Sequence, residues 1–195
     1  MNKKYTIPDR ANLHNYMLDT TAYNHISMNS EMFKIIKESR ITGFCYYTTK
    51  IQDMELLGYG AKTYGQDGMP NIKYHMPSEQ LKQFDEIEEQ LNVGLVPEVG
   101  LLMFNHFRAD GTHRFIDIES IEGQIFNEIV SKNNSQSKRP FAYSHDAVIA
   151  EAAIHYGCIL VTDDKELRET INSYMSVRAI STDELVEIIK EYQAK

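Results

Sequence analysis

The sequence lacks several features that mark particular classes of protein. It has no apolar run near the ~18 residues that a membrane helix needs, and its opening stretch, MNKKYTIPDR, lacks the apolar core of a signal peptide. It contains no internal repeat and no low-complexity tract. Its two cysteines, Cys45 and Cys158, lie in apolar strand-like runs, which favours buried reduced thiols over a disulfide. We therefore expect a cytoplasmic protein with no membrane segment.

The chain is also short of positive charge. It carries 20 lysines and arginines against 28 aspartates and glutamates, a formal net charge of −8. This balance argues against a broad basic surface for nucleic acid, although a cluster of metal-binding carboxylates adds negative charge that a bound divalent cation reverses locally. The seven histidines show none of the ligand spacings that zinc sites use.

What is present fits one domain of the α/β class, spanning residues 1–195. The chain is 42% hydrophobic and 25% charged, which suits a globular domain. Apolar strand patterns alternate with helical ones, which predicts a mostly parallel central sheet flanked by helices. The block 63–112 fits this alternation poorly and is predicted to be an insertion or an enlarged helical arm. Within it, the stretch 93–107 is interrupted by Pro97 and Gly100 and indicates neither helix nor strand.

The strongest local pattern is YSHDAVIAEAAIHYGCILVTDDKEL, which begins at Tyr143. Its first half has a serine N-cap and apolar residues at helical spacing, and Gly157 suits a helix C-terminus, where positive φ is common. The unbroken apolar run 158–161 then predicts a central strand. Asp146 therefore starts a helix, and the pair Asp163-Asp164 leaves the strand.

A similar order of strand and acid occurs near the N-terminus. Residues 16–18 are apolar and are followed by Asp19, and a strand is also predicted over 41–47. Thr49 to Gln52 has the pattern of a capping box, so a helix that carries Glu55 is predicted to start there. The remaining predictions are helices at about 22–26, 29–38, 78–91, 121–131, 165–174 and from a capping box at 181–184, a polar loop at 132–139 and a last strand at 177–180.

These acids are predicted to converge. Asp19 and Asp163 or Asp164 end strands, while Asp146 and Glu55 lie near helix starts, and in a parallel sheet those points share one edge. Like charges packed together are costly without a cation, and hard oxygen ligands favour Mg²⁺ or Mn²⁺ over zinc. Such a site positions a water and offsets charge on a phosphodiester during hydrolysis.

The pieces LDTTAYNHI (18–26), YYTTKIQDMELLG (46–58), HDAVIAEAA (145–153) and ILVTDDKEL (159–167) resemble the PIN domain, most nearly its VapC-type toxin ribonucleases. The resemblance covers about two-thirds of the chain and is weak from about 63 to 112. It implies a parallel sheet flanked by helices and an endoribonuclease that needs Mg²⁺ or Mn²⁺ and cuts single-stranded RNA. As a toxin, the protein would also have an antitoxin protein as its partner.

The resemblance assigns four acids as metal ligands and catalytic residues: Asp19, Glu55, Asp146 and Asp164. They match, in order, the first-strand acid, the helix glutamate before a Leu-Leu-Gly, the acid of Asp-Ala-x-Ile-Ala, and the acid two residues after the strand-ending threonine. Asp163 is an extra acid that would be a further metal ligand. Two small hydroxyl positions near the metal are matched by Thr20 and Thr162.

Structural interpretations compete with these assignments. Asp146 alone suits a first-turn acid that stabilises a helix equally well. Asp163 is interpreted as the N-cap of the helix that follows, with Glu166 at its third position, in preference to a metal ligand. Glu55 alone has the pattern of a solvated helix residue. Asp19 has the weakest structural alternative, because an acid that ends a central strand is desolvated without a partner.

Two other functions stay open. One is a non-catalytic protein-interaction module that keeps the fold, which the acidic balance favours somewhat. The other is a metal-dependent nuclease or phosphatase that acts on DNA or small phosphoesters; its aspartyl-phosphate form is weakened because residue 21 is Thr, so no Asp-x-Asp pair follows the first strand. The block 63–112 has three open roles, in a homodimer, in substrate contact or in partner binding. The sequence does not decide between one and two metal ions.

Overall fold

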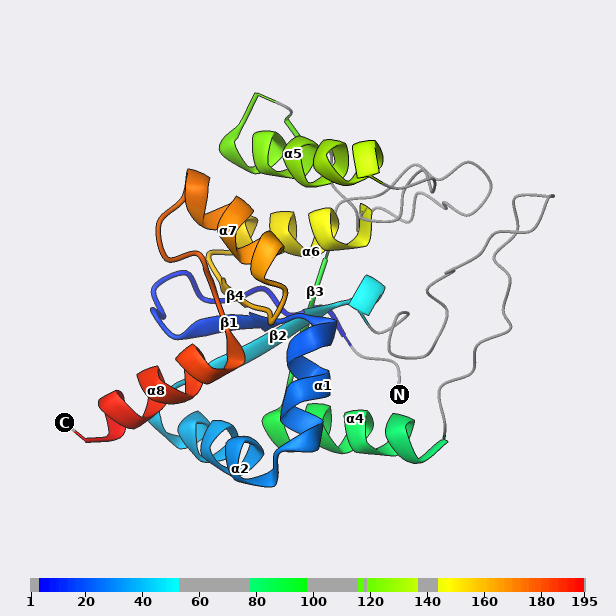
Figure 1. Cartoon of the computed structure of the whole chain (residues 1–195). Coiled ribbons are helices and arrows are strands. Elements are labelled where there is room, and N and C mark those ends of the chain that lie inside the picture. Colours follow the sequence, from blue (N-terminus) through cyan, green and yellow to red (C-terminus); the bar gives the residue numbers. More distant parts are fainter. Residues whose placement is uncertain (1–3, 53–77, 98–115, 118, 137–143, 195) are drawn as a thin grey trace.

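In the described part of the chain, five parallel strands form one sheet (Figure 1). The structure, a computed structural model, describes residues 4–52, 78–97, 116–117, 119–136 and 144–194. The strands are β1 (Asn15–Leu18), β2 (Cys45–Thr49), β3 (Gly94–Val96), β4 (Ile159–Val161) and β5 (Ala179–Ile180), in the order β3-β2-β1-β4-β5. The predicted α/β fold with a parallel central sheet is confirmed.

Helices cover both faces of this sheet (Figure 1). One face carries α1 (Thr20–Met28), α2 (Ser30–Ser39), α4 (Ser78–Leu91) and α8 (Thr182–Gln193). The other carries α5 (Ile121–Gln136), α6 (Ser144–His155) and α7 (Lys165–Tyr174). A further helix begins at Lys50, directly after β2. None of the helices described has the length and apolar character that crossing a membrane requires.

Each face of the sheet has its own hydrophobic core, because successive strand residues point to opposite faces. In β1, Tyr16 and Leu18 join the core shared with α1, α2, α4 and α8, whereas Met17 joins the core shared with α5, α6 and α7. In β2, Tyr46 and Tyr47 divide in the same way. All five side chains are buried, as expected of strands covered on both faces.

Local signals in the sequence set several element ends. Both predicted capping boxes form: the amide of Thr49 donates to Gln52 Oε1 (2.6 Å) and the amide of Gln52 to Thr49 Oγ1 (3.5 Å), and Ser181 and Glu184 pair in the same way at the start of α8. Gly157 has a φ of +72°, as predicted, and turns the chain from α6 toward β4.

The predicted boundary of the second strand is wrong. The pattern over 41–47 predicts strand throughout, but Arg40–Thr42 form a 3₁₀ helix and β2 begins at Cys45. Gly43 between them has a φ of +94°, and Ile41 is 90% exposed. The β-branched and aromatic residues in this stretch indicate strand propensity, but they do not report the left-handed turn that Gly43 makes.

Two more boundaries differ from the prediction. The strand predicted over 177–180 is reduced to β5, because Val177 has a φ of +57° and stands exposed in the preceding turn. The polar loop predicted over 132–139 is helical through Gln136, the last residue of α5, and residues 137–139 lie outside the described residues. The run KNNSQ contains no glycine or proline that would end a helix earlier.

The block 63–112 lies only partly among the described residues. Within it, α4 packs on the sheet through Phe84, Ile87 and Leu91, and β3 pairs with β2. The ambiguous stretch 93–107 thus contains a strand, and its part from residue 98 onward lies outside the described residues. The insertion or helical arm stays a prediction.

Both cysteines are free thiols. Cys158, just before β4, is completely buried, and burial raises the pKa of its thiol to about 12. Cys45, at the start of β2, is half-buried. Burial thus disfavours the thiolate of Cys158, and we assign no chemistry to either residue.

Candidate active site

The carboxyl ends of β1 and β4 form a topological switch point. The two strands are neighbours in the sheet, but the chain leaves β1 toward one face, into α1, and leaves β4 toward the other, into α7 (Figure 1). The amide of Asp19, the residue after β1, donates to the carbonyl of Val161, the last residue of β4 (2.9 Å). Ligands of open α/β sheets bind at such points. The topology therefore favours a site around Asp19.

Asp19 occupies the N-cap position of α1 but does not cap the helix. Its backbone has extended angles (φ −75°, ψ 164°), yet its side chain accepts no capping hydrogen bond. Its Oδ2 instead accepts hydrogen bonds from the hydroxyls of Thr21 (2.8 Å) and Thr162 (2.7 Å). The residue is only 3% exposed. Helix capping, the usual structural reason for an acid at this position, therefore does not explain this buried carboxylate.

Backbone amides fix the two hydroxyls in turn. Thr21 Oγ1 accepts from the amide of Asp163 (3.0 Å), and Thr162 Oγ1 accepts from the amide of Asp164 (3.2 Å). Each hydroxyl has one proton, and both protons point to Asp19, so the 3.1 Å between the two hydroxyl oxygens leaves no proton for a further donation. These chains of donors polarise one another and fix the orientation of the Asp19 carboxylate before any ligand binds.

Asp163 joins three elements through its carboxylate. Oδ1 accepts from the amide of Thr182 (3.0 Å), and Oδ2 accepts from the Thr182 hydroxyl (2.8 Å) and lies 2.9 Å from His25 Nδ1. Burial alone would raise the pKa of Asp163, but the hydrogen bonds from Thr182 and His25 outweigh it and hold the pKa below its ordinary value. Both oxygens are engaged, which leaves Asp163 poorly suited to bind a metal.

The interpretation of Asp163 as the N-cap of the next helix is wrong. Asp164 is the N-cap of α7: its Oδ1 accepts from the amide of Leu167 (3.0 Å). The helix itself spans residues 165–174 as predicted, and Glu166 is its second residue. Of two adjacent aspartates, the exposed one caps, because the other is held by contacts with α1 and α8.

Asp146 lies in the first turn of α6, at the same edge of the sheet as Asp19. Only residues 156–158 separate α6 from β4, so the helix runs back along the strand and starts near the carboxyl ends (Figure 1). Asp146 is half-buried, in contrast to the fully buried run 147–153 that follows it. The position is compatible with a metal ligand and also with an acid that stabilises the helix dipole.

Glu55 lies outside the described residues, and its role stays a prediction. The start of the helix predicted to carry it is described, and Gln52 fixes it in place. The side-chain amide of Gln52 donates to the carbonyl of Leu18, the last residue of β1, while its oxygen accepts from the amide of Thr49. Gln52 is fully buried. The helix after β2 is thus attached directly to the last residue of β1, which precedes Asp19.

The described residues do not form a complete metal site by themselves. Among them, no three His, Cys, Asp or Glu side chains lie close enough together to hold one ion. Asp19 has the chemistry of a Mg²⁺ or Mn²⁺ ligand, since it is a preoriented carboxylate at the switch point, and Asp146 and Asp164 lie at the same edge. Mg²⁺ typically binds through one or two carboxylates and keeps several waters, so this donor set fits that ion if further ligands complete it.

The sequence interpretation missed two residues of this site. On α1 the hydroxyl of Thr21 donates to Asp19, whereas Thr20, the position matched from the family pattern, is half-buried beside it. The signal for Thr21 was available, because a hydroxyl two residues after an acid commonly bonds to it. Gln52 was assigned only its capping role, since its bond to Leu18 joins segments that are distant in sequence.

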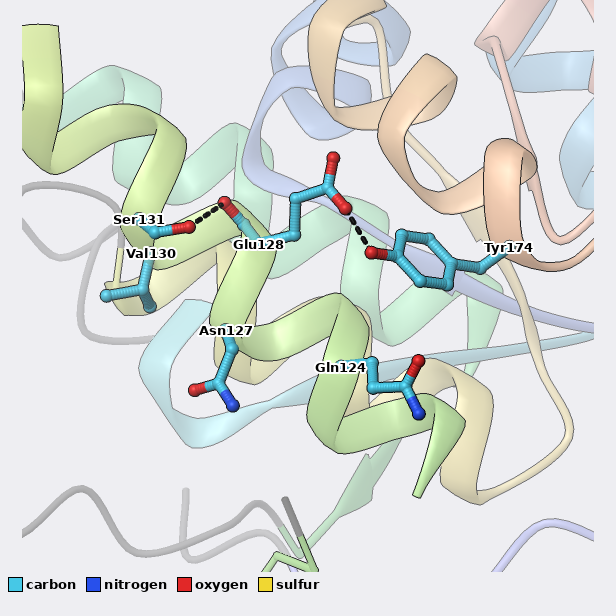
Figure 2. A pocket seen from close by; sticks show the side chains of 6 residues that line it. All are labelled: Gln124, Asn127, Glu128, Val130, Ser131 and Tyr174. Atoms are coloured by element: carbon cyan, nitrogen blue, oxygen red, sulfur yellow. Dashed lines mark hydrogen bonds between the residues drawn. The ribbon is translucent and has the colours of Figure 1, made fainter. Parts of the chain in front are cut away.

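The hollow shown in Figure 2 lies away from this site. It has a volume of about 560 Å³ and is lined by residues of α5 and by Tyr174 of α7, whose hydroxyl donates to the carboxylate of Glu128. Asp164 precedes the first residue of α7 and Tyr174 is its last, so the hollow lies at the far end of α7 from the Asp19 site. It therefore does not extend the Asp19 site.

Comparisons with known proteins give a weak likeness only. No family model matches the chain, and no curated protein matches it in sequence. Among solved structures, VapBC-1 from nontypeable Haemophilus influenzae is similar with a TM-score of 0.44 and 17% identity, over 87% of this chain and 98% of that one. The likeness adds nothing to the fold class, which rests on the sheet order and strand directions above.

Proposed function

We propose that this protein is a Mg²⁺- or Mn²⁺-dependent endoribonuclease that hydrolyses phosphodiester bonds in single-stranded RNA. The observation that carries the proposal is the state of Asp19. Its carboxylate is buried at the switch point, does not cap α1, and is oriented by two neutral hydroxyls. A carboxylate that is oriented in advance at a switch point is the kind of hard oxygen ligand that Mg²⁺ and Mn²⁺ prefer.

The ligands we propose are Asp19, Asp146, Asp164 and Glu55, some of them acting through a metal-bound water, since the three described acids do not lie close enough together to bind one ion directly. Asp164 uses one carboxylate oxygen to cap α7, so the other is available. Glu55 is included on the PIN-domain resemblance alone. Asp163 is left out, because hydrogen bonds engage both of its oxygens. When bound, the ion would supply positive charge beside the scissile phosphate and orient the attacking water.

The chain's own contribution is to preorganise these oxygens. Thr21 and Thr162 hold the Asp19 carboxylate in one orientation, and partners of this kind typically change metal affinity 10- to 100-fold when removed, roughly. Gln52 fixes the start of the helix after β2 to the end of β1. The contacts of the Asp163 carboxylate with His25 and Thr182 hold the loop after β4 against α1 and α8. These contacts hold the Asp19 carboxylate and the loop that carries Asp164 in fixed positions.

The experiment is cleavage of a pool of single-stranded RNAs by the purified protein, with Mn²⁺, Mg²⁺ or EDTA. Single-stranded DNA and a small phosphoester are tested in parallel. The variants are Asp19→Asn and Asp146→Asn, with Asp85→Asn on the exposed side of α4 as the control. We expect metal-dependent RNA cleavage in the wild type and the control and none in the other two. Cleavage that survives both site substitutions would refute the site, and cleavage of DNA or the phosphoester alone would refute the substrate.

A second candidate is a non-catalytic protein-interaction module with the same fold. It is favoured by the observation that the described residues hold no group of three acids close enough for a metal ion. It predicts no metal-induced rise in the melting temperature and no effect of Asp146→Asn on partner binding. Metal binding that depends on Asp19 would exclude it.

We also propose, from the resemblance to VapC-type toxins alone, that an antitoxin protein binds this chain. It would cover the carboxyl ends of β1 and β4, where Asp19 and Asp164 lie. Expression of the chain without that partner should then arrest growth, and Asp19→Asn should relieve the arrest. Normal growth on strong expression of the wild-type chain would contradict the toxin role. Copurification of a small protein encoded beside it would support the partner.

A further inference from the structure

Arg168, in the first turn of α7, is attached to the strand end that carries the site. Its Nη1 donates a hydrogen bond to the carbonyl of Thr162 (2.6 Å). The hydroxyl of the same Thr162 donates to Asp19 (2.7 Å). A guanidinium and the central carboxylate therefore share one fully buried residue as their partner, through its carbonyl and its hydroxyl respectively. This contact holds the charge of Arg168 at the site.

No acid in the described part of the chain neutralises that charge. None of the ion pairs found there includes Arg168. Lys165, three residues earlier in the same turn of α7, behaves differently: it is 80% exposed and pairs with Glu169 (3.6 Å). A guanidinium has five N–H donors in a planar fork, and Thr162 takes one of them. The others form the kind of fork that binds phosphate through two parallel hydrogen bonds.

The carboxyl ends of the strands are acidic, so binding RNA there requires a positively charged side chain such as Arg168. The chain has a net charge of −8, and Asp19, Asp163 and Asp164 stand together at the strand ends. RNA brings one negative charge per nucleotide, and contacts to phosphates supply much of the affinity of nucleic-acid-binding proteins. A positive group that is fixed next to the carboxylates offsets this repulsion without disturbing them.

We propose that Arg168 is a phosphate-binding residue of this site and binds a backbone phosphate of single-stranded RNA next to the scissile phosphodiester bond. The inference rests on the proposed endoribonuclease function and names the residue that positions its substrate. Arg168 takes no part in the hydrolysis itself; it fixes which phosphodiester bond of the RNA lies beside Asp19. The positive charge that binds the RNA phosphate thus comes from one half-buried arginine, which is anchored to the carbonyl of Thr162, and not from a broad basic surface.

The test measures binding of a short fluorescent single-stranded RNA of random sequence, in EDTA so that nothing is cleaved, across a range of salt concentrations. The full chain is compared with Arg168→Gln, Arg168→Lys and Lys165→Gln. The last variant removes the same charge from the same turn of the same helix, and its residue is exposed. Urea unfolding of each variant reports whether the fold is kept.

We expect Arg168→Gln to weaken binding about tenfold. The slope of log affinity against log salt should become shallower by about 0.7, the value for one lost phosphate contact to a single strand. Arg168→Lys should keep the slope and lose part of the affinity, because a lysine keeps the charge but not the fork. Lys165→Gln should change neither. In cleavage assays Arg168→Gln should raise KM more than it lowers kcat.

Other results would overturn the inference. Equal losses in Arg168→Gln and Lys165→Gln would mean that only the general charge counts. Reduced stability with unchanged RNA binding would mean that Arg168 merely satisfies the Thr162 carbonyl. RNA binding that depends on Arg168 without any cleavage would refute the catalytic function and keep the inference, whereas cleavage with full activity in Arg168→Gln would do the reverse. A wild-type protein that binds no RNA would refute both.

Discussion

Replacing Thr162 with valine isolates the hydrogen bond between a buried hydroxyl and Asp19. Valine has nearly the shape of threonine, so the completely buried position gains no cavity, and the change removes one donor to Asp19 Oδ2 (2.7 Å) and one acceptor for the amide of Asp164 (3.2 Å). A hydrogen bond to a charged group is worth about 1.5–3 kcal/mol. The second bond is longer and ends at an exposed residue, so water replaces it at little cost. We expect Thr162→Val to lower the free energy of unfolding by about 2 kcal/mol.

The assay is urea unfolding followed by circular dichroism in EDTA at neutral pH. Thr162→Ser keeps the hydroxyl and loses a methyl group, so it should cost about 1 kcal/mol. Thr170→Val is the matched control: Thr170 is also buried, and its hydroxyl donates to the carbonyl of Glu166 within α7 (2.9 Å), a bond whose loss should stay within about 0.5 kcal/mol. A Thr162→Val cost no larger than that of Thr170→Val would refute the claim that this network stabilises the Asp19 carboxylate.

Three further outcomes follow from individual contacts. The pKa of Asp163 is held below its ordinary 3.8, so its carboxylate stabilises the fold above that pH, and the contribution is lost as the pH falls through the lowered value. Asp163→Asn should therefore flatten the acid side of a plot of stability against pH. An unchanged plot would contradict the stabilising contacts of Asp163 with Thr182 and His25. Burial raises the pKa of Cys158 from 9.0 to about 12, so above pH 9.0 the unfolded chain loses a proton that the folded chain keeps. Stability should then fall as pH rises, with Cys158 contributing about 1.4 kcal/mol per pH unit, and urea unfolding of Cys158→Ala should show a shallower fall. A Cβ at Gly94 would lie 2.9 Å from Tyr47 Cδ1, so Gly94→Ala should cost about 1–3 kcal/mol, and an unchanged urea midpoint would show that the ring moves freely.

The parts of the fold that were predictable depend on short-range signals. Strand-then-acid patterns located Asp19 and the loop after β4, and the capping boxes located the helices after β2 and β5, because each of these signals lies within a few residues of the chain. The start of β2 was misplaced, since a positive φ at Gly43 is not visible in a pattern of β-branched and aromatic residues.

The parts of the site that were missed depend on contacts between distant segments. Which of two adjacent aspartates caps α7 is decided by Thr182 and His25, which lie on α8 and α1. The attachment of Arg168 to Thr162 becomes visible only once α7 folds back on the strand end. A sequence pattern lists acids and hydroxyls that suit a metal site, but the packing of α1, α7 and α8 decides which of them are already engaged.

The central claim is that the Asp19 carboxylate holds a divalent cation, and calorimetric titration with Mn²⁺ tests it without reference to any substrate. The wild-type chain and Asp19→Asn are titrated beside Asp85→Asn, which removes an exposed acid from α4. We predict saturable Mn²⁺ binding in the wild type and in Asp85→Asn, and its loss in Asp19→Asn. Equal Mn²⁺ binding in all three proteins, or none in the wild type, would contradict the claim that Asp19 is a metal ligand.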